Sequence, residues 1–201
     1  MSNNVIETVI ETESIAKLLQ DSIDVKQLML ADQAMLASIA DVALRCVETL
    51  RAGNKLLLAG NGGSASDAQH IAAELVGRFE IDRKGLPAIA LTTNASQLTA
   101  ISNDYGYEAV FSRQVQAFGA KGDLFIGLST SGNSANVVAA AEVAKAQGLM
   151  IVGMTGASGG KLESLCDVCL KIPSTNTARI QESHITVGHI LCAQIERELF
   201  S

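Results

Sequence analysis

The feature that most constrains this chain is the stretch from Lys55 to Phe79, which reads KLLLAGNGGSASDAQHIAAELVGRF. An apolar run from Lys55 to Ala59 has the length of a strand and stops at a turn with three glycines, which allow backbone angles closed to other residues. A segment with apolar residues at helical spacing follows, and its N-cap candidates are Ser64, Ser66 and Asp67. Glycine N–H groups, seryl hydroxyls and the positive end of a helix therefore converge, which favours a phosphate site.

Four further apolar runs of strand length alternate with segments of helical character. The runs are Ala88 to Leu91, Asp123 to Leu128, Met150 to Met154 and Val168 to Ile172. The helices are expected at Ser96 to Ser102, Glu108 to Phe118 and Ala135 to Gln147, with a loop at Asn103 to Gly106. This alternation predicts an α/β fold with a parallel sheet and helical crossovers.

Helical patterns also occupy both ends of the chain. Apolar residues recur every three or four positions from about Ile6 to Ala52, with a break predicted near Ser22 to Val25 and with Gly53 ending the pattern. The last segment, Thr177 to Phe200, is predicted to form one long helix. We expect the first helix to pack on a partner chain.

Length and composition exclude several classes of protein. A chain of 201 residues is expected to form one domain, residues 1–201, with N-terminal helices at about 5–52 and an α/β core at about 53–201. It is 48% hydrophobic without an apolar run long enough to span a bilayer, and its acidic N-terminus lacks the features of a signal peptide. We therefore expect a cytoplasmic protein with no membrane contact. A net charge of −6 and only 3% aromatic residues argue against nucleic-acid binding.

Cys166 and Cys169 have the spacing of a redox or zinc pair. The sequence has no second such pair, and the segment continues into an apolar run that is typical of a buried strand. We interpret both residues as reduced thiols of the core.

A second loop, LSTSGNS, follows the Asp123 strand and carries the hydroxyl residues Ser129, Thr130, Ser131 and Ser134. Ligands of open parallel sheets bind at the carboxyl ends of strands, so this loop and the glycine turn are expected to face one crevice. Hydroxyls also serve simply as caps of helices and turns. Two such loops in one chain favour a phosphate site, and neither matches a nucleotide-binding signature, so we expect a small phosphorylated ligand.

The three histidines are distributed over two predicted helices. His70 and Glu74 are four residues apart and share a helix face, which suits a surface contact as well as half of a metal site. His184 and His189 are five apart and point to different sides, so at most one of them is expected to meet His70. A histidine on an apolar helix is most often a core residue.

Together, GNGGSASDAQHIAAE, STSGNSANV and ARIQESHITVGH resemble the phosphoheptose isomerases of the sugar isomerase domain superfamily. The resemblance implies a flavodoxin-like three-layer α/β sandwich, with the central parallel sheet flanked by helices, and a homotetramer with active sites at subunit interfaces. It implies the interconversion of sedoheptulose 7-phosphate and D-glycero-D-manno-heptose 7-phosphate, the first step toward ADP-heptose and the lipopolysaccharide core.

The resemblance also implies a set of site residues. One zinc ion per subunit would be bound by His70, Glu74, Gln181 and His189. Substrate contacts would come from Asn61, Gly62, Gly63, Ser64, Asn103, Asp104, Ser129, Thr130, Ser131, Ser134 and Gln181. Asn94 and Ala178 depart from some family members, which have aspartate at these positions.

Isomerisation of an aldose and a ketose needs a base, an acid and stabilisation of an oxyanion, and Glu74 and His189 are the available acid/base residues. A carboxylate bound to zinc is a poor base, so Glu74 is a ligand, a base, or each at different stages. Gln181 and His189 are eight residues apart, so one straight helix can hardly bring both to one ion. Either the helix is broken near Gln181 or one ligand comes from another subunit, and we favour the second.

Two alternatives belong to other functional classes. A relative of these isomerases binds the bacterial replication initiator without catalysis, but such a protein would not need Glu74 and His189. A sugar-phosphate sensor of a transcription regulator would need a DNA-binding segment, which the sequence does not show.

Overall fold

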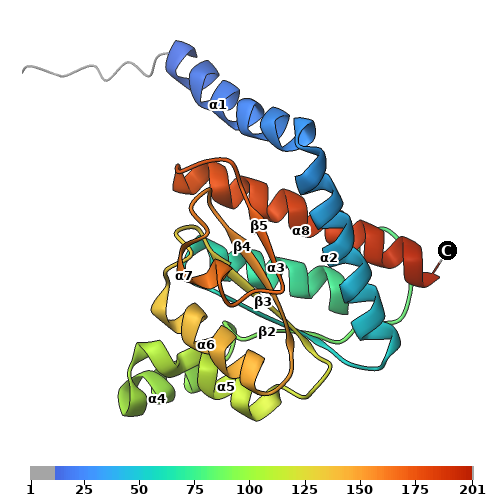
Figure 1. Ribbon diagram of the computed structural model, residues 1–201, viewed down its shortest axis with the longest axis vertical. Coiled ribbons are helices and arrows are strands. Elements are labelled where there is room, and N and C mark those ends of the chain that lie inside the picture. Colours follow the sequence, from blue (N-terminus) through green and yellow to red (C-terminus); the bar gives the residue numbers. More distant parts are fainter. Residues whose placement is uncertain (1–11, 201) are drawn as a thin grey trace, which may run out of the picture.

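A sheet of five parallel strands forms the centre of the computed structural model, which describes residues 12–200 (Figure 1). The strands are β1 Leu56–Gly60, β2 Ala88–Ala90, β3 Leu124–Ser129, β4 Met150–Thr155 and β5 Val168–Lys171. Their order in the sheet is β2-β1-β3-β4-β5, and every neighbouring pair is parallel. Each predicted strand occurs, with both ends within one residue of the expected positions.

Burial on both faces explains why these strands appear as unbroken apolar runs in the sequence. Every residue of β1 and β3 is buried, as expected where helices cover both sides of a parallel sheet. Leu56 and Leu58 pack into one hydrophobic cluster, whereas Leu57 and Ala59 pack into a second one on the opposite face. This alternation along β1 divides the core into two layers.

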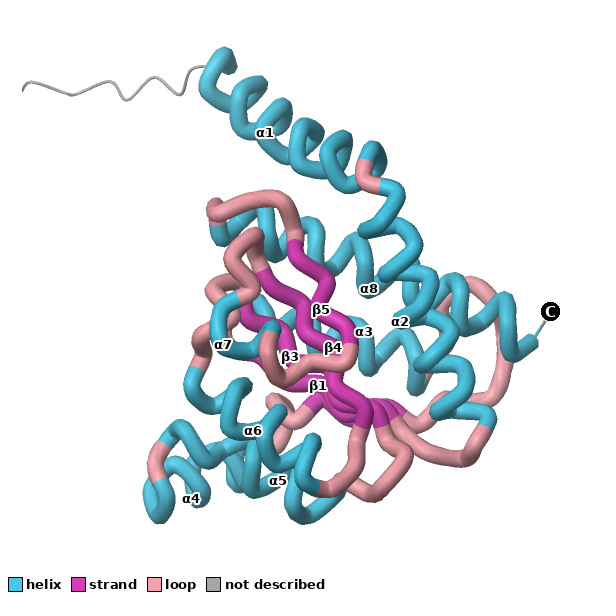
Figure 2. The backbone as a smooth tube through the Cα atoms, viewed as in Figure 1, coloured by secondary structure: helices cyan, strands magenta, loops and turns pink. Residues whose placement is uncertain are grey.

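The helices form the outer two layers of the predicted three-layer sandwich. One face of the sheet carries α2 Gln33–Arg51, α3 Gly63–Val76 and α8 Thr177–Phe200. The other carries α5 Val110–Phe118, α6 Ala135–Ala146 and α7 Gly160–Glu163. The helix α4 Ala95–Tyr105 and the 3-10 turn η1 Tyr107–Ala109 join the second layer beside α5 and α6 (Figure 2).

The N-terminal helical region breaks later than predicted. Its helices are α1 Thr12–Ala31 and α2, which meet at an angle of 81°, so the break expected near Ser22 to Val25 is wrong. Asp32 produces the break because its carboxylate accepts hydrogen bonds from the N–H groups of Ala34 and Met35 and so caps α2. The helical pattern before residue 12 lies outside the described residues.

The helix α1 extends away from the body of the molecule (Figure 1). Only Val25 and Met29 of this helix are buried, and the Ser22 hydroxyl donates to the Glu182 carboxylate of α8 over 2.8 Å.

Within residues 12–200, no single helix has the length and apolar character needed to cross a bilayer. The bent pair α1 and α2 meets that test only when the two helices are taken together.

Two further expectations about helix ends are corrected. The first helix after the glycine turn begins at Gly63, because Gly62 with φ +56° occupies the N-cap position, so Ser64, Ser66 and Asp67 lie inside the helix. The expected loop at Asn103 to Gly106 is mostly helical, since α4 continues to Tyr105. It ends at Gly106, whose φ of +83° is accessible to glycine.

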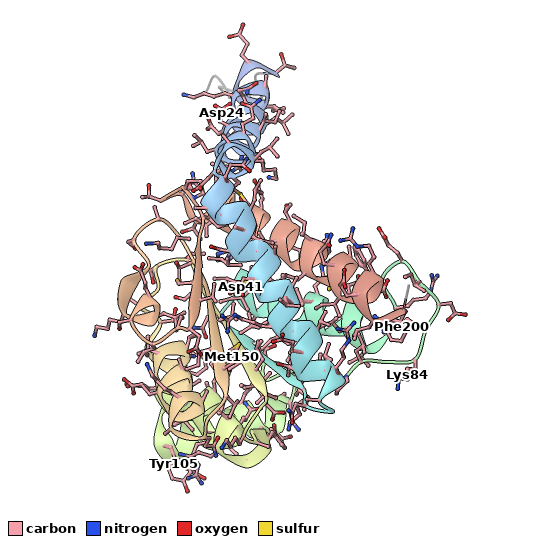
Figure 3. All side chains as sticks on the ribbon, turned by 45° about the vertical axis from the view of Figure 1, so that its right-hand side comes forward. Asp24, Asp41, Lys84, Tyr105, Met150 and Phe200 are labelled. Atoms are coloured by element: carbon pink, nitrogen blue, oxygen red, sulfur yellow. The ribbon has the colours of Figure 1, made fainter. Side chains whose placement is uncertain are left out.

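A buried carboxylate holds the connection from α3 to β2 against α8. Glu196 accepts hydrogen bonds of 2.8 to 2.9 Å from the backbone N–H groups of residues 79–81, and it pairs with Arg83 at 2.8 Å. Burial raises the pKa of Glu196, whereas these hydrogen bonds and the Arg83 charge lower it. The lowering effects together are larger, so the pKa of Glu196 is below its usual value. Lys84 of this connection and Phe200 at the end of α8 lie on the same side of the molecule (Figure 3).

The four cysteines fall into two pairs with different environments. All four are free thiols. Cys46 and Cys192 are fully buried, and burial raises the pKa of each to about 12. Cys166 and Cys169 are only half-buried, which corrects the expectation that both belong to the core.

Candidate active site

The helices α3 and α8 lie side by side and run in the same direction, and glycines permit their close contact. A Cβ added at Gly188 would lie 2.6 Å from Cδ1 of Ile71, and one added at Gly63 would lie 2.6 Å from the side-chain amide of Gln181. Only glycine fits such positions without displacing a neighbour. His70 is the neighbour of Ile71 in α3, and His189 is the neighbour of Gly188 in α8. The two histidines therefore face each other across the helix pair.

His70, Glu74 and His189 form a cluster of three possible metal ligands. Nε2 of His70 lies 3.1 Å from Oε1 of Glu74 and 3.5 Å from Nε2 of His189. The three ligand atoms lie within 4.8 Å of one another. The His70 side chain is 46% exposed and that of Glu74 is 25% exposed, so the cluster is open to a ligand from solvent. His189 is the histidine of α8 that meets His70.

The donor set of this cluster fits zinc. Two imidazole nitrogens and one carboxylate oxygen are the ligands of many catalytic zinc sites, which keep a fourth position open for water or substrate. The two Nε2 atoms cannot both donate to each other, so at least one presents a lone pair to the space between them. Phe79 packs its ring 5.5 Å from that of His189 and limits the movement of this imidazole.

Asp67 is a further titratable group on α3, one turn before His70. Burial raises its pKa to about 6, and the nearby His70 opposes part of this shift. Its Oδ2 atom is buried and has no hydrogen-bond partner among residues 12–200. The Asp67 carboxyl group can therefore retain a proton close to neutral pH.

His184 faces the interior, on a different side of α8 from His189. Its Nε2 lies 3.2 Å from the carbonyl oxygen of Thr155, and because a carbonyl only accepts, Nε2 carries the proton. The residue is fully buried, and its Nδ1 has no partner within the described part of the chain. Burial lowers the pKa of His184 to about 4, although the Thr155 hydrogen bond raises it. The environment is that of a neutral core histidine.

The hydroxyl loop between β3 and α6 borders a pocket of about 160 Å³. The pocket lies near the carboxyl ends of β3, β4 and β5, beside the first turn of α8, and Thr130 and Ser131 reach it from the loop. Its lining consists of Thr130, Ser131, Ala157, Ser158, Ser174, Thr175, Thr177 and Ile180. Six of these eight residues carry hydroxyls, and a helix N-terminus with hydroxyl donors suits an anion.

The remaining hydroxyls of the two loops are placed differently. Ser129 and Ser134 share a hydrogen bond of 2.9 Å between their Oγ atoms. Ser64 is only 3% exposed. None of these three residues lines the pocket that Thr130 and Ser131 border.

The glycine turn is fixed to the hydroxyl loop by two asparagines. Asn61 and Asn136 exchange hydrogen bonds of 2.8 and 2.9 Å between their side-chain amides, and the Tyr107 hydroxyl lies 3.1 Å from Oδ1 of Asn61. Asn136 and Tyr107 were not singled out from the sequence. The position of Asn136 within the segment STSGNSANV, two residues after Ser134, is the one signal that could have indicated it.

Three predicted site residues lie apart from the cluster. The Gln181 amide lies against Gly63, which precedes His70 by two helical turns, or about 10 Å along α3. Asn103 donates to the Asp104 carboxylate over 2.8 Å, and both residues are exposed at the end of α4. Their neighbour Tyr105 lies at the end of the molecule opposite to α1 (Figure 3).

Comparison with known families finds relatives over most of the chain. The SIS domain family matches residues 22–156. A phosphoheptose isomerase from Aneurinibacillus thermoaerophilus is 59% identical over 182 residues, which cover 90% of this chain and 92% of the relative.

Solved structures give the same result. A phosphoheptose isomerase from Neisseria gonorrhoeae superposes with a TM-score of 0.86 and 43% identity, over 92% of this chain and 98% of that one. A phosphoheptose isomerase from Francisella tularensis superposes with a TM-score of 0.89 and 36% identity, over 94% and 100% of the two chains.

Proposed function

The chain belongs to the phosphoheptose isomerases of the SIS domain family and is a sugar-phosphate isomerase, and we propose that it interconverts sedoheptulose 7-phosphate and D-glycero-D-manno-heptose 7-phosphate. This reaction would be the first step of ADP-heptose formation for the lipopolysaccharide core. Because phosphorylated sugars are charged and do not cross membranes freely, the proposal includes a cytoplasmic location.

The cluster of His70, Glu74 and His189 is the observation that carries this proposal. The reaction moves a proton between C1 and C2 of the sugar through an enediol, which requires a base and an acid close to two adjacent oxygens. Three groups able to bind or transfer protons converge within 4.8 Å on a partly exposed surface. A protein that only binds partners would have no use for this arrangement.

We propose zinc as the resident metal, with His70, Glu74 and His189 as ligands from one chain. When bound, zinc would polarise the carbonyl group and hold the two neighbouring oxygens of the sugar on one side. Contacts within the chain place these groups: Nε2 of His70 lies 3.1 Å from Oε1 of Glu74, and the Phe79 ring packs on His189.

Glu74 and His189 are the proposed proton-transfer residues. Oε1 of Glu74 faces His70, so Oε2 is the atom that we assign to taking the proton from the sugar carbon. His189 would protonate and deprotonate the adjacent oxygen at a stage when its Nε2 is not bound to the metal. Asp67 supports them as a group that exchanges protons near neutral pH.

The phosphate is proposed to bind at the hydroxyl loop. Support comes from the pocket of about 160 Å³, in which Thr130 and Ser131 meet the N-terminal turn of α8. Ser64, Ser129 and Ser134 would shape this region, and Asn61 together with Gly62 and Gly63 would contact the sugar. Asn103 and Asp104 remain proposed substrate contacts.

We further propose a homotetramer whose active sites lie at subunit interfaces. The helix α1 exposes a row of apolar side chains, and a groove of about 490 Å³ runs between α2 and α8. The exposed residues of α1 are Ile15, Leu18, Leu19, Ile23, Leu28 and Leu30. Apolar surface of this extent supports burial against other copies of the chain. Gln181 would then act as ligand and substrate contact in a neighbouring subunit.

The direct test is to incubate the zinc-loaded protein with sedoheptulose 7-phosphate and to follow the sugar by NMR. We expect the signals of D-glycero-D-manno-heptose 7-phosphate to grow until an equilibrium mixture is reached. A Glu74→Gln control should leave the substrate unchanged. If the wild-type protein converts another ketose phosphate but not this one, the proposed substrate is wrong.

A further inference from the structure

Cys166 and Cys169 have no part in the proposed reaction, yet their thiols share one small space. Cys166 follows α7, Cys169 lies in β5, and both sulfur atoms lie over Gly153 of β4. A Cβ added at Gly153 would lie 2.6 Å from Sγ of Cys166 and 3.3 Å from Sγ of Cys169. The two thiols are close enough to influence each other's ionisation. Because Gly153 has no side chain, the two sulfur atoms can occupy the space above it.

The two thiols differ in their surroundings. The Cys166 thiol donates a hydrogen bond of 3.1 Å to the carbonyl oxygen of Leu162, and the carboxylates of Glu163 and Asp167 are nearby. A Cys169 thiolate could accept a hydrogen bond from the Cys166 S–H group if that group turned away from Leu162. The Thr155 hydroxyl lies 3.6 Å from Sγ of Cys169, with the Lys171 ammonium group close by. Negative charge therefore opposes ionisation of Cys166, whereas hydrogen-bond donors and a cation favour ionisation of Cys169.

The pKa shifts follow these surroundings. The hydrogen bond from Cys166 lowers the pKa of Cys169 to about 7, with help from Thr155 and Lys171 and against the effects of burial and Glu163. The pKa of Cys166 is raised, first by the hydrogen bond to Cys169 and then by burial. Cys169 is therefore the thiol that carries the nucleophilic charge near neutral pH.

A metal site does not account for this pair. Within residues 12–200, the cluster of His70, Glu74 and His189 is the only group of three or more histidine, cysteine or acidic residues whose ligand atoms lie close enough to bind one ion. A structural zinc ion takes four ligands, and two sulfur atoms alone do not provide them. Disulfide chemistry needs only the two thiols.

We propose that Cys166 and Cys169 form a redox-active dithiol site that closes to an intramolecular disulfide on reaction with a low-molecular-weight disulfide. The Cys169 thiolate attacks one sulfur of that disulfide, its S–S bond breaks, and one thiolate leaves with the electron pair. Cys166 then loses its proton and attacks Sγ of Cys169, and the second thiolate leaves. The protein gives up two protons and two electrons, and the small disulfide becomes two thiols.

The test uses the reduced full-length protein and oxidised glutathione at about pH 7, where Cys169 is partly ionised. Free thiols are then alkylated, first in the native state and again after denaturation, and the peptides are mapped by mass spectrometry. We expect the loss of two hydrogen atoms and a peptide in which Cys166 is linked to Cys169. Cys46 and Cys192 should be alkylated only after denaturation, because both are buried. A protein that stays fully reduced, or that keeps glutathione on both residues of the pair, would overturn the proposal.

Two serine variants test the order of the steps. Cys166→Ser retains a hydroxyl that can donate to Cys169, so it should accumulate a stable mixed disulfide at Cys169, with a rate that rises through a midpoint near pH 7. Cys169→Ser should react with glutathione at least about tenfold more slowly, because the raised pKa of Cys166 leaves little thiolate. Equal rates in the two variants would contradict the assignment of Cys169 as the attacking residue. Neither variant alters a residue of the proposed active site, so this test is independent of the isomerase activity.

Discussion

The Nε2 atoms of His70 and His189 lie 3.5 Å apart, although 119 positions separate the two residues in the chain. Neither helix alone could form this contact, since it depends on the parallel packing of α3 against α8 at Gly188. Glu74 adds its carboxylate from one helical turn after His70. The cluster is therefore a property of the helix pair, and any substitution that separates α3 from α8 should also disperse the ligands.

Replacing His189 by alanine should remove the metal. Two ligands from α3 would remain, and sites with so few protein ligands bind zinc weakly, so the zinc content should fall from about one ion per subunit to well below half. Elemental analysis after dialysis measures this content. His184→Gln is the matched control, because His184 lies on the same helix but contacts Thr155 instead of the cluster. Full retention of zinc by His189→Ala would show that His189 is not a ligand.

Replacing Glu74 by glutamine should lower kcat by about 100-fold or more, since an amide can neither take the proton nor supply a charged ligand. Glu142→Gln, at an exposed position of α6, is the control and should keep the wild-type rate. Circular dichroism checks that both variants are folded. A Glu74→Gln enzyme with normal turnover would exclude both proposed roles of this residue.

Loss of hydroxyls near the phosphate should weaken substrate binding. Ser131→Ala removes a hydroxyl from the lining of the pocket and should raise KM by about 5- to 100-fold, which corresponds to about 1 to 3 kcal/mol. Adding Ser64→Ala tests the contribution of the glycine turn as well. Ser164→Ala is the control, because its hydroxyl is exposed and lies 2.9 Å from the carbonyl oxygen of Lys161. An unchanged KM in the double variant would place the phosphate elsewhere.

The strands were predictable because their burial on both sheet faces leaves an apolar run in the sequence, as in Leu56 to Ala59. The break between α1 and α2 was missed because it depends on a single capping side chain, Asp32, with no glycine or proline beside it. The start of α3 was misplaced because backbone angles at Gly62, instead of a seryl cap, begin that helix.

The candidate site was only partly accessible to sequence reasoning. The pair of His70 and Glu74 follows from helical spacing alone. The choice of His189 over His184 depends on which side of α8 faces α3, and helical spacing could state only that the two histidines diverge. The contact between Asn61 and Asn136 joins two loops that are 75 positions apart, so no local pattern indicates it.

The stability of the fold should decrease as the pH falls from about 6.5 to about 4, in part because of His184. Its pKa is lowered to about 4 in the folded protein, whereas an unfolded histidine titrates near 6.5. Between these values the unfolded state binds the proton and the folded state does not, so protonation favours unfolding. Above pH 6.5 neither state is protonated, and the contribution is zero. The full loss amounts to about 3 kcal/mol by pH 4.

Urea denaturation of the wild type and of His184→Gln at several pH values measures this contribution. The amide of glutamine can still donate to the Thr155 carbonyl but has no proton to gain. The difference in unfolding free energy between the two proteins should therefore change by up to about 3 kcal/mol across this window. Subtraction removes the opposite effect of Asp67, whose raised pKa stabilises the folded state as the pH falls through about 6. A difference that is independent of pH would contradict the buried neutral state of His184.

The last prediction concerns Gln181, which we expect to complete the active site of a neighbouring subunit. The helix α8 is continuous from Thr177 to Phe200, so the alternative of a helix broken near Gln181 is wrong. The cluster of His70, Glu74 and His189 lies within one chain, whereas the Gln181 amide lies against Gly63, two turns away. If Gln181 binds the metal, the metal that it binds must therefore belong to another copy, as a closed symmetric oligomer permits.

Mixtures of inactive variants distinguish shared sites from unshared ones. In a mixed oligomer of His70→Ala and Gln181→Ala, the Gln181→Ala chain keeps its cluster of His70, Glu74 and His189. The His70→Ala chain can supply Gln181 to that cluster, so activity should return when the subunits exchange. In a mixture of His70→Ala and His189→Ala, every cluster lacks one histidine because both residues come from the same chain, so activity should stay absent. Native mass spectrometry verifies that mixed oligomers form. Recovery in the second mixture would mean that the cluster is assembled between chains, and no recovery in the first would mean that Gln181 does not serve a neighbouring site.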